Sequence, residues 1–371
     1  MKFRVQRAQL YPYITAVTKA VSSRSPLEIL KGVLLEVKEH QLTLTGSDGE
    51  VTIVTSVEVY GEEDGSVVID GNILKNVIRH LPNAAINFSL EGSALVIVCE
   101  DAKFQLSTSS AKEYPSLPHF EVQESFSVPR VVLEEGIHHT IGSVSKDEMR
   151  LALTGILWDI APDSISFVSL DGFRMAMHRY PVNAGFAREA IVPSRSAQLL
   201  TQLMNDMVET VAISISDQHM RLEFSDLTLY TKLIQGPFFS YEDLRRTDHE
   251  ITVRVKREEL VQCLLRTGLL STQDRSNLVR LDVTSHQVVL SSKSEIGKVR
   301  ELLEATVEGY VSEEEPFVIA FNNRYLLDGV DAIASEEVLL QFTNKISPCI
   351  IEEADESKDY FYLVLPVRTP F

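Results

Sequence analysis

The sequence is long enough for two or three domains and has the composition of a globular protein. It has 371 residues, of which 44% are hydrophobic, and this content excludes disorder as the main state. The longest apolar runs, such as 94–99, are far too short to cross a membrane, and residues 1–7 lack the apolar core of a secretory signal. We therefore expect a cytoplasmic protein with no membrane partner.

Charge and cysteine content narrow the function classes further. The chain has 53 acidic and 35 Lys and Arg residues, which gives a net charge of −18. Taken alone, this balance disfavours a nucleic-acid binder, because duplex DNA is itself a dense polyanion. The cysteines at 99, 263 and 349 are far apart and odd in number, so we expect buried thiols and no metal pair or disulfide framework.

The predicted elements of the first third of the chain recur twice. In chain order, this third has a strand at 3–5, a helix at 7–22, strands at 41–45 and 67–69, a helix at 71–81 and a strand at 85–90. The second third has the same order at 126–128, 130–144, 164–169, 190–192, 194–206 and 211–215, and the last third at 251–255, 256–270, 287–291, 317–319, 322–333 and 338–342. The strands alternate in polarity, and the second helix of each third is amphipathic.

The repeat predicts three domains of the α+β class, each with two helices packed on antiparallel sheets. A proline-bearing joint at 115–118 and a polar joint at 247–250 divide the chain into domains 1–124, 125–248 and 249–371. The six helix windows carry a small excess of Lys and Arg, so the rest of the chain carries the negative excess. From the residues alone, the charge pattern favours a solvated face for these helix cations.

Several short motifs identify a family resemblance. They are MKF at 1–3, LTGSDGE at 44–50, QLST at 105–108, YPSL at 114–117, SLDGFRMA at 169–176, IVP at 191–193 and LPVR at 365–368. In their order and spacing, and with the threefold repeat, the chain resembles the bacterial sliding clamp family, the beta subunits of DNA polymerase III, over its whole length.

The resemblance implies a fold, a function and a set of partners. The fold would be three repeated clamp domains, two copies of which form a head-to-tail dimer and a six-domain ring with helices lining the hole. The ring would encircle duplex DNA, slide without sequence preference and tether the replicative polymerase, with no catalysis and no cofactor. The implied partners are double-stranded DNA, a second copy of the chain, the DNA polymerase III catalytic subunit, the clamp loader and other clamp-binding-motif proteins. The alternative is a specialised clamp paralogue with altered DNA or partner binding.

The resemblance and the helix positions together suggest phosphate-facing cations. The candidates are Arg24, Lys75, Arg79, Lys146, Arg150, Arg195, Arg266, Arg275 and Arg324. Four of them, Arg24, Arg79, Arg150 and Arg195, fall where other clamps carry basic residues, and the remainder rest on helix placement. Leu151 and Ala152 stand where some clamps have two tyrosines, so we do not expect aromatic stacking on single-stranded template there.

The resemblance also implies a cleft that holds partner peptides. Its candidate residues are Leu153, Leu170, Gly172, Phe173, Arg174, Met175, Phe239, Leu244, Tyr325, Ile346, Pro348, Leu363, Leu365, Pro366 and Val367. Such a pocket would be mostly apolar, and Met175 at its surface would adapt to several ligands. The alternative is that these residues are ordinary core at strand ends.

Three features of the cleft depart from the family pattern. Phe239 replaces a usual proline, and Glu242 and Asp243 replace two arginines of some clamps. We expect this acidic pair to repel acidic partner peptides. The tail 369–371 runs past the usual end, and we expect it to lie near the cleft.

For the ring joint, the resemblance points to an edge strand and a helix end. Phe104 and Leu106 of the first domain would meet Leu269 and Leu270 of the third domain of another copy. The same residues could instead be buried within their own domains.

An enzyme is the main competing class, and no motif supports it. His138 and His139 are adjacent on a helix, so they point apart and cannot share a metal ion. Asp48 and Asp171 recur at equivalent repeat positions, which favours turn formation. No P-loop, dinucleotide fingerprint or nucleophile elbow is present.

Overall fold

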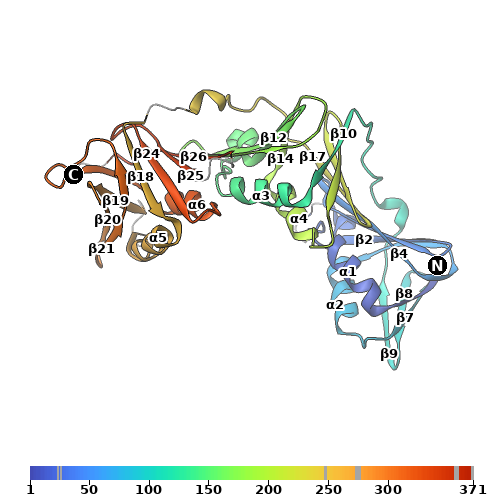
Figure 1. Cartoon of the computed structure of the whole chain (residues 1–371). Coiled ribbons are helices and arrows are strands. Elements are labelled where there is room, and N and C mark those ends of the chain that lie inside the picture. The colour runs from blue at the N-terminus through green and yellow to red at the C-terminus, as the bar shows by residue number, and fades with distance from the viewer. Residues whose placement is uncertain (23–24, 26, 246–248, 272–276, 355–358, 369–371) are drawn as a thin grey trace. The chain divides into compact units, whose positions relative to one another are not determined.

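The computed structural model describes residues 1–22, 25, 27–245, 249–271, 277–354 and 359–368. The chain forms two compact units, one of Met1–Val131 with Arg195–Leu233 and the other of Val132–Ser194 with Ile234–Phe371. The middle third of the chain therefore contributes to both units. In the described residues, the α-helices are α1 Arg7–Val17, α2 Gly71–His80, α3 Arg130–Ile141, α4 Ser194–Leu203, α5 Arg257–Ser271 and α6 Asn323–Asp331 (Figure 1). The six predicted helices are thus confirmed, although all but α5 end earlier than predicted.

Two antiparallel sheets form the first unit. One has the strand order β5-β1-β7-β8-β9 and the other the order β10-β15-β16-β17-β4-β3-β2-β6. The strands are β1 Lys2–Gln6, β2 Gly32–Lys38, β3 Gln41–Ser47, β4 Val51–Glu58, β5 Tyr60–Glu63, β6 Gly65–Asp70, β7 Ala85–Glu91, β8 Ala94–Cys99, β9 Ala102–Ser107, β10 Glu124–Pro129, β15 Thr210–Ile215, β16 His219–Phe224 and β17 Leu227–Lys232. Two 3₁₀ turns, η1 Glu28–Lys31 and η2 Ala111–Glu113, complete this unit.

The second unit repeats this plan. Its sheets have the orders β14-β11-β12-β13-β26-β25-β24-β18-β22 and β21-β20-β19-β23. The strands are β11 Gly155–Ala161, β12 Ser164–Leu170, β13 Arg174–Pro181, β14 Arg188–Pro193, β18 Ile251–Lys256, β19 Leu278–Val283, β20 Gln287–Ser294, β21 Gly297–Glu304, β22 Thr306–Glu308, β23 Phe317–Asn322, β24 Glu337–Phe342, β25 Cys349–Glu353 and β26 Asp359–Val364. The 3₁₀ turns are η3 Glu148–Thr154 and η4 Glu242–Leu244.

Helix α2 shows how the sequence forms the second helix of a third. The Oδ1 atom of Asp70 accepts a hydrogen bond of 2.8 Å from the N–H of Ile73, which satisfies one of the free donors at the helix start. Leu74 and Ile78, one turn apart, are fully buried. In α6, the side chain of Asn322 likewise caps the first turn. The caps therefore fix where these two helices begin, and the apolar spacing fixes the face that each helix buries.

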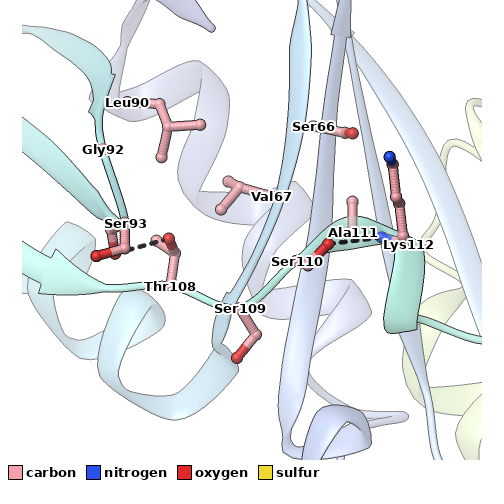
Figure 2. A pocket seen from close by; sticks show the side chains of 10 residues that line it. All are labelled: Ser66, Val67, Leu90, Gly92, Ser93, Thr108, Ser109, Ser110, Ala111 and Lys112. Atoms are coloured by element: carbon pink, nitrogen blue, oxygen red, sulfur yellow. Dashed lines mark hydrogen bonds between the residues drawn. The ribbon is translucent and has the colours of Figure 1, made fainter.

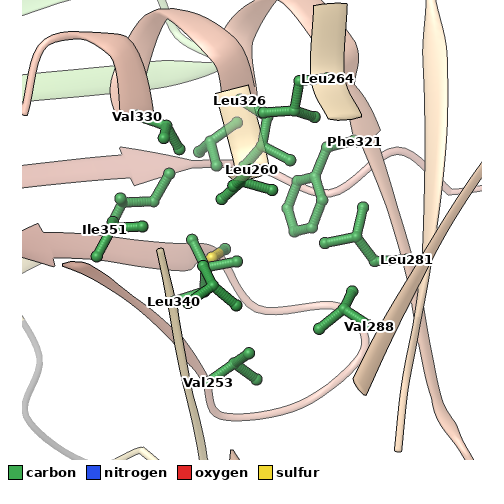
Figure 3. Close-up of a cluster of buried hydrophobic side chains, with 14 of the residues drawn as sticks. Val253, Leu260, Leu264, Leu281, Val288, Phe321, Leu326, Val330, Leu340 and Ile351 are labelled. Atoms are coloured by element: carbon green, nitrogen blue, oxygen red, sulfur yellow. The ribbon is translucent and has the colours of Figure 1, made fainter. Parts of the chain in front are cut away.

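The core of the last third lies between its two helices and its sheets (Figure 3). Leu260 and Leu264 of α5 and Leu326 of α6 have no exposed surface. They pack with strand residues such as Val253 and Leu281, which are equally buried. Burial of one face of each helix against a sheet is the two-layer arrangement that the α+β prediction requires.

Strands of successive thirds pair with each other inside each unit. Strand β4 pairs with β17, with Val51 opposite Thr231, and β13 pairs with β26, with Arg174 opposite Val364. In the repeat, β9 of the first third is equivalent to β17 and β26, and β21 of the last third is equivalent to β4 and β13. Both stand at the end of their sheets, so among the described strands each has a partner on one side only.

The structure also tests two expectations from composition. All three cysteines are free and buried, as predicted. None of the described helices is both long enough and apolar enough to cross a membrane.

Candidate partner cleft and DNA-facing cations

Part of the predicted cleft forms one apolar cluster in the second unit. Leu170, Met175 and Leu363 are buried in it, and Leu153 and Leu244 pack against it. Met175 is only 2% exposed, because β13 pairs Met175 with Leu363 across the ladder. The prediction that Met175 lies at the surface of the cleft is therefore wrong, because its side chain is part of the buried cluster.

Arg174 is a charged residue of this region that is bound by several partners. Its Nε atom donates to Oδ2 of Asp171 at 3.0 Å, and its Nη1 atom donates to Oδ2 of Asp328 in α6. Its guanidinium lies 4.2 Å from the ring centroid of Tyr325. Burial alone would lower the pKa of Arg174, but Tyr362 and Asp328 outweigh it and raise the pKa above its ordinary value. Arg174 is thus a fixed cation that joins β13 to α6.

An aromatic and aliphatic surface surrounds Arg174. The ring of Phe173 is 59% exposed and stacks on Tyr325, with 6.2 Å between ring centroids. The N–H of Leu365 donates to the carbonyl of Phe173 at 2.8 Å, which brings the end of the chain to this turn. Leu365 is itself 39% exposed. Phe173, Tyr325 and Leu365 therefore present apolar surface beside one buried cation, as a peptide cleft requires.

The remaining cleft candidates are less closely grouped. Gly172 adopts a φ of +91°, a conformation that favours glycine. A Cβ atom at this position would lie 3.7 Å from Nη1 of Arg150, so the turn lies beside the predicted DNA-facing residue Arg150. Phe239 and Ile346 are exposed on loops, at 53% and 68%, and Pro348 is half-buried. Within the described residues, none of these three forms a hydrogen bond or a ring contact with Phe173, Arg174, Tyr325 or Leu365.

The last two candidates follow the end of β26. Pro366 and Val367 are half-buried, and the N–H of Val367 donates to the carbonyl of Ala320 at 2.8 Å. This bond carries the chain from the turn at Phe173 toward β23. The tail at 369–371, which we expect near the cleft, lies outside the described residues.

The acidic rim is partly neutralised. Oε1 of Glu242 accepts a hydrogen bond of 3.0 Å from Nη2 of Arg179, whereas Asp243 is exposed. Arg245 is paired with Asp359 at 2.6 Å in the same region. The predicted repulsion of acidic peptides is therefore weaker than two free carboxylates would give.

The structure separates the candidate DNA-facing cations into two groups. Arg24 and Arg275 lie outside the described residues. Four candidates have a carboxylate partner, and the pairs are Arg195 with Asp48, Arg266 with Glu301, Arg324 with Asp328 and Arg150 with Asp147. Lys75, Arg79 and Lys146 have no ion pair within the described ranges, and Arg79 and Lys146 are exposed. Sequence spacing could not reveal the partner of Arg195, because Asp48 is 147 residues away, whereas Asp147 and Asp328 are local partners of Arg150 and Arg324.

The predicted joint residues are partly exposed on the isolated chain. Phe104 on the edge strand β9 is 38% exposed, and Leu269 near the end of α5 is 71% exposed. Leu106 and Leu270 are half-buried. The alternative of burial within their own domains is thus wrong for Phe104 and Leu269, which leave apolar surface for a partner.

The motifs considered for catalysis have structural roles. His138 is exposed, whereas His139 is buried with its Nδ1 atom 2.7 Å from Nδ1 of His178. The two adjacent rings lie edge to face, with 5.7 Å between their centroids. Asp48 and Asp171 form turns by accepting backbone N–H groups. In the described ranges, no three His, Cys, Asp or Glu residues are placed to hold a metal ion.

One pocket lies in the first unit, beside the end of β9. It has a volume of about 340 Å³ and is lined by hydroxyl groups of the first unit, among them Ser66, Ser93 and Ser110 (Figure 2). The hydroxyl of Thr108 donates to the carbonyl of Ser93 at 2.9 Å, and Oγ of Ser110 accepts from the N–H of Lys112. The hydroxyls of Thr108 and Ser110 thus bond to the backbone of the pocket wall.

Comparisons with known proteins decide the family. Models of the N-terminal, central and C-terminal domains of the DNA polymerase III beta subunit match residues 1–118, 127–239 and 246–368. The chain belongs to the DNA polymerase III beta subunit family. The beta sliding clamps of Streptomyces coelicolor and Bacillus subtilis are 30% and 28% identical, over 99% and 100% of both chains.

Solved structures of the family agree with the fold. The sliding clamp of Bacillus subtilis matches with a TM-score of 0.94 at 28% identity, over 100% of both chains. That of Pseudomonas aeruginosa matches with a TM-score of 0.93 at 26% identity, also over 100% of both chains. The prediction of three clamp domains is therefore confirmed, while the exact boundaries at 124 and 248 stay a prediction. None of these relatives is described as a specialised paralogue.

Proposed function

We propose that this chain is a DNA sliding clamp that works as a head-to-tail homodimer in the bacterial cytoplasm. Two copies close into a ring around duplex DNA, slide along it without sequence preference and tether a DNA polymerase. The chain itself performs no catalysis. The single observation that carries the proposal is the repeated pairing of one strand with a strand of the next third.

The two internal joints predict how a second copy binds. Val51, Arg174 and Gly297 are equivalent residues, each separated from the next by 123 positions (174 − 51 and 297 − 174). The first two lie opposite Thr231 and Val364 at the joints β4–β17 and β13–β26. The third joint needs a strand opposite β21, and β9 is the equivalent strand with a free edge. Pairing of β21 with β9 of another copy is heterologous and closes a ring after two copies.

The register of this third joint follows from the hairpins. Ala102 and Leu227 both begin the final strand after a two-residue turn, so Leu106 is equivalent to Thr231. Leu106 then lies opposite Gly297 of the partner copy, and Gln105 lies opposite Lys298. Phe104 lies opposite Val299, as Leu229 lies opposite Ile53 at the first internal joint. The exposed apolar surface of Phe104 and Leu269 would be buried by this pairing, which supports closure.

Ring closure explains how an acidic chain can act on DNA. A ring that surrounds the duplex is released by opening a joint and not by breaking ion pairs, so it needs few phosphate contacts. Lys75, Arg79 and Lys146, which have no carboxylate partner in the described ranges, would supply such contacts. Because phosphate contacts carry no sequence information, this supports sliding without sequence preference.

The cleft of the second unit would tether the polymerase. The exposed Phe173 beside Tyr325 and Leu365 offers apolar anchoring surface, and Arg174 fixes the wall. We propose that the polymerase catalytic subunit, the clamp loader and other proteins with a clamp-binding motif insert a short peptide here. The exposed Phe239 and Ile346 would contact the ends of the same peptide.

Cysteine cross-linking tests the joint that the proposal needs. A chain that carries both Gln105→Cys and Lys298→Cys places each new cysteine opposite the other one of the partner copy. Their Cα atoms would be about 4.5–5.5 Å apart, a separation that a disulfide can span. Oxidation should give a covalent dimer on a non-reducing gel, and negative-stain electron microscopy should show closed rings. The native cysteines are buried and leave this reaction undisturbed.

The control moves one cysteine to the neighbouring residue. In Gln105→Cys with Val299→Cys, the second thiol points to the opposite face of the strand, so little cross-linking is expected. Equal yields from both pairs, or a monomer that does not cross-link, would contradict the proposed ring.

A further inference from the structure

Arg195 is a predicted DNA-facing cation that the folded chain already neutralises. It lies in the first turn of α4 and donates from Nη1 to Oδ2 of Asp48, in the turn between β3 and β4. The side chain of Asp48 is 8% exposed, whereas that of Arg195 is 49% exposed. The arginine is therefore accessible to a ligand, but its carboxylate partner is not.

Backbone groups hold the Asp48 carboxylate in place. Its Oδ1 atom accepts hydrogen bonds from the N–H groups of Glu50 at 3.0 Å and Val51 at 2.9 Å. Because the carboxylate is fixed by the turn, it cannot follow the arginine toward a phosphate. A phosphate that binds Arg195 must take the guanidinium from Asp48.

A second candidate cation is held in a similar way. Arg266 of α5 donates from Nε and Nη2 to both carboxylate oxygens of Glu301 on β21, at 2.9 and 2.8 Å. This bidentate pair raises the pKa of Arg266 and lowers the pKa of Glu301. A helix arginine is thus paired with a carboxylate in both units, from the turn between β3 and β4 in the first and from β21 in the second.

We propose that Asp48 restrains Arg195 from DNA phosphates and so keeps the contact between ring and DNA weak. This inference rests on the proposed function. A free cation that binds a phosphate releases condensed counterions from DNA, and this release drives binding at low salt. An arginine that must first leave a carboxylate gains less free energy on binding a phosphate. The ring therefore makes fewer effective phosphate contacts than the number of its candidate cations. Weak contacts let the ring move along the duplex.

Asp48→Asn tests this role with little change of shape. Asparagine keeps the Oδ1 acceptor for the turn and removes the charge that holds Arg195. The matched control is Glu50→Gln, because Glu50 is exposed in the same turn and the charge change is identical. Binding of both full-length variants to a fluorescent duplex oligonucleotide is measured by anisotropy between 50 and 200 mM salt.

The expected result is specific to Asp48→Asn. Two freed arginines in each dimer add up to about two phosphate contacts, which corresponds to binding about three- to tenfold tighter at 50 mM salt and a steeper salt dependence. Glu50→Gln should bind nearly as the unmodified protein does. Adding Arg195→Ala to Asp48→Asn should remove the gain.

Each other outcome has a defined meaning. If the unmodified protein binds and Asp48→Asn equals Glu50→Gln, net charge explains the effect and the inference is wrong. If Asp48→Asn lowers the melting temperature but leaves DNA binding unchanged, the ion pair is only structural and the inference is again wrong. If no variant binds the linear duplex at 50 mM salt, freeing Arg195 adds no effective phosphate contact and the inference is wrong, whereas the proposed function is tested separately by the cross-linked ring.

Discussion

The proposed joint places two cations opposite each other, and reversing one of them should tighten the dimer. In the register derived from the internal joints, Lys103 of β9 lies opposite Arg300 of the partner's β21. The equivalent internal pairs, Thr228 with Val54 and Phe361 with Met177, are uncharged. Like charges directly opposite each other destabilise a strand pair. Arg300→Glu replaces this repulsion by attraction at both joints of the ring.

The size of the effect follows from the strand spacing. Two unit charges about 5 Å apart in water interact by about 0.8 kcal/mol, and a Debye length of about 8 Å at physiological salt reduces this to about 0.4 kcal/mol. Reversing the sign therefore changes each joint by about 0.9 kcal/mol. With two joints in each ring, the dissociation constant should fall about 20-fold. Added salt should narrow the difference.

Sedimentation or mass photometry of four proteins tests the pairing itself. Arg300→Glu and Lys103→Glu should each tighten the dimer, and the double variant, with Glu opposite Glu, should return toward the unmodified protein. This cycle removes the separate effects of other nearby charges, such as that of Asp101 in the turn before β9. Additive effects of the two single changes would refute the register, because residues that do not face each other show no coupling.

Two further predictions concern stability. Gly136→Ala should lower the free energy of unfolding by about 1–3 kcal/mol, because its Cβ would lie 2.3 Å from the ring of Phe167. Gly142→Ala, with nothing closer than 3.7 Å, is the control in the same urea titration, and equal losses would contradict this packing argument. Burial and the charge of Lys232 lower the pKa of His219, so the unfolded chain binds more protons as the pH falls below about 6.5. His219→Gln should therefore reduce the loss of stability between pH 7 and 5, and an unchanged pH dependence would exclude this contribution.

Sequence reasoning found the elements of the fold because their signals are local. The apolar spacing of Leu74 and Ile78 and the acidic cap at Asp70 are enough to predict α2. The first helix was predicted to reach residue 22 but ends at Val17, and tight turns follow it. The apolar spacing does not show where the helix ends and such turns begin. Helix number and order were predictable, whereas their ends were not.

The candidate site was predicted less completely, since its contacts join distant residues. The burial of Met175 depends on Leu363, which pairs with it across the ladder from 188 positions away (363 − 175). The pairing of Arg174 with Asp328 and that of Arg195 with Asp48 depend on the fold in the same way. The repeat did carry one usable signal, because Asp48 and Asp171 occupy equivalent turns and each also binds an arginine. Sequence spacing alone cannot show which arginine is bound.

Topological trapping on DNA is the most direct test of the central claim. The Gln105→Cys, Lys298→Cys protein is oxidised in the presence of nicked circular DNA, and the complexes are washed in 1 M salt, where phosphate contacts are screened. A closed ring should remain on the circle through this wash and leave once a restriction enzyme linearises the DNA. Cross-linked protein that the wash removes equally from circular and linear DNA would show that it does not encircle the duplex.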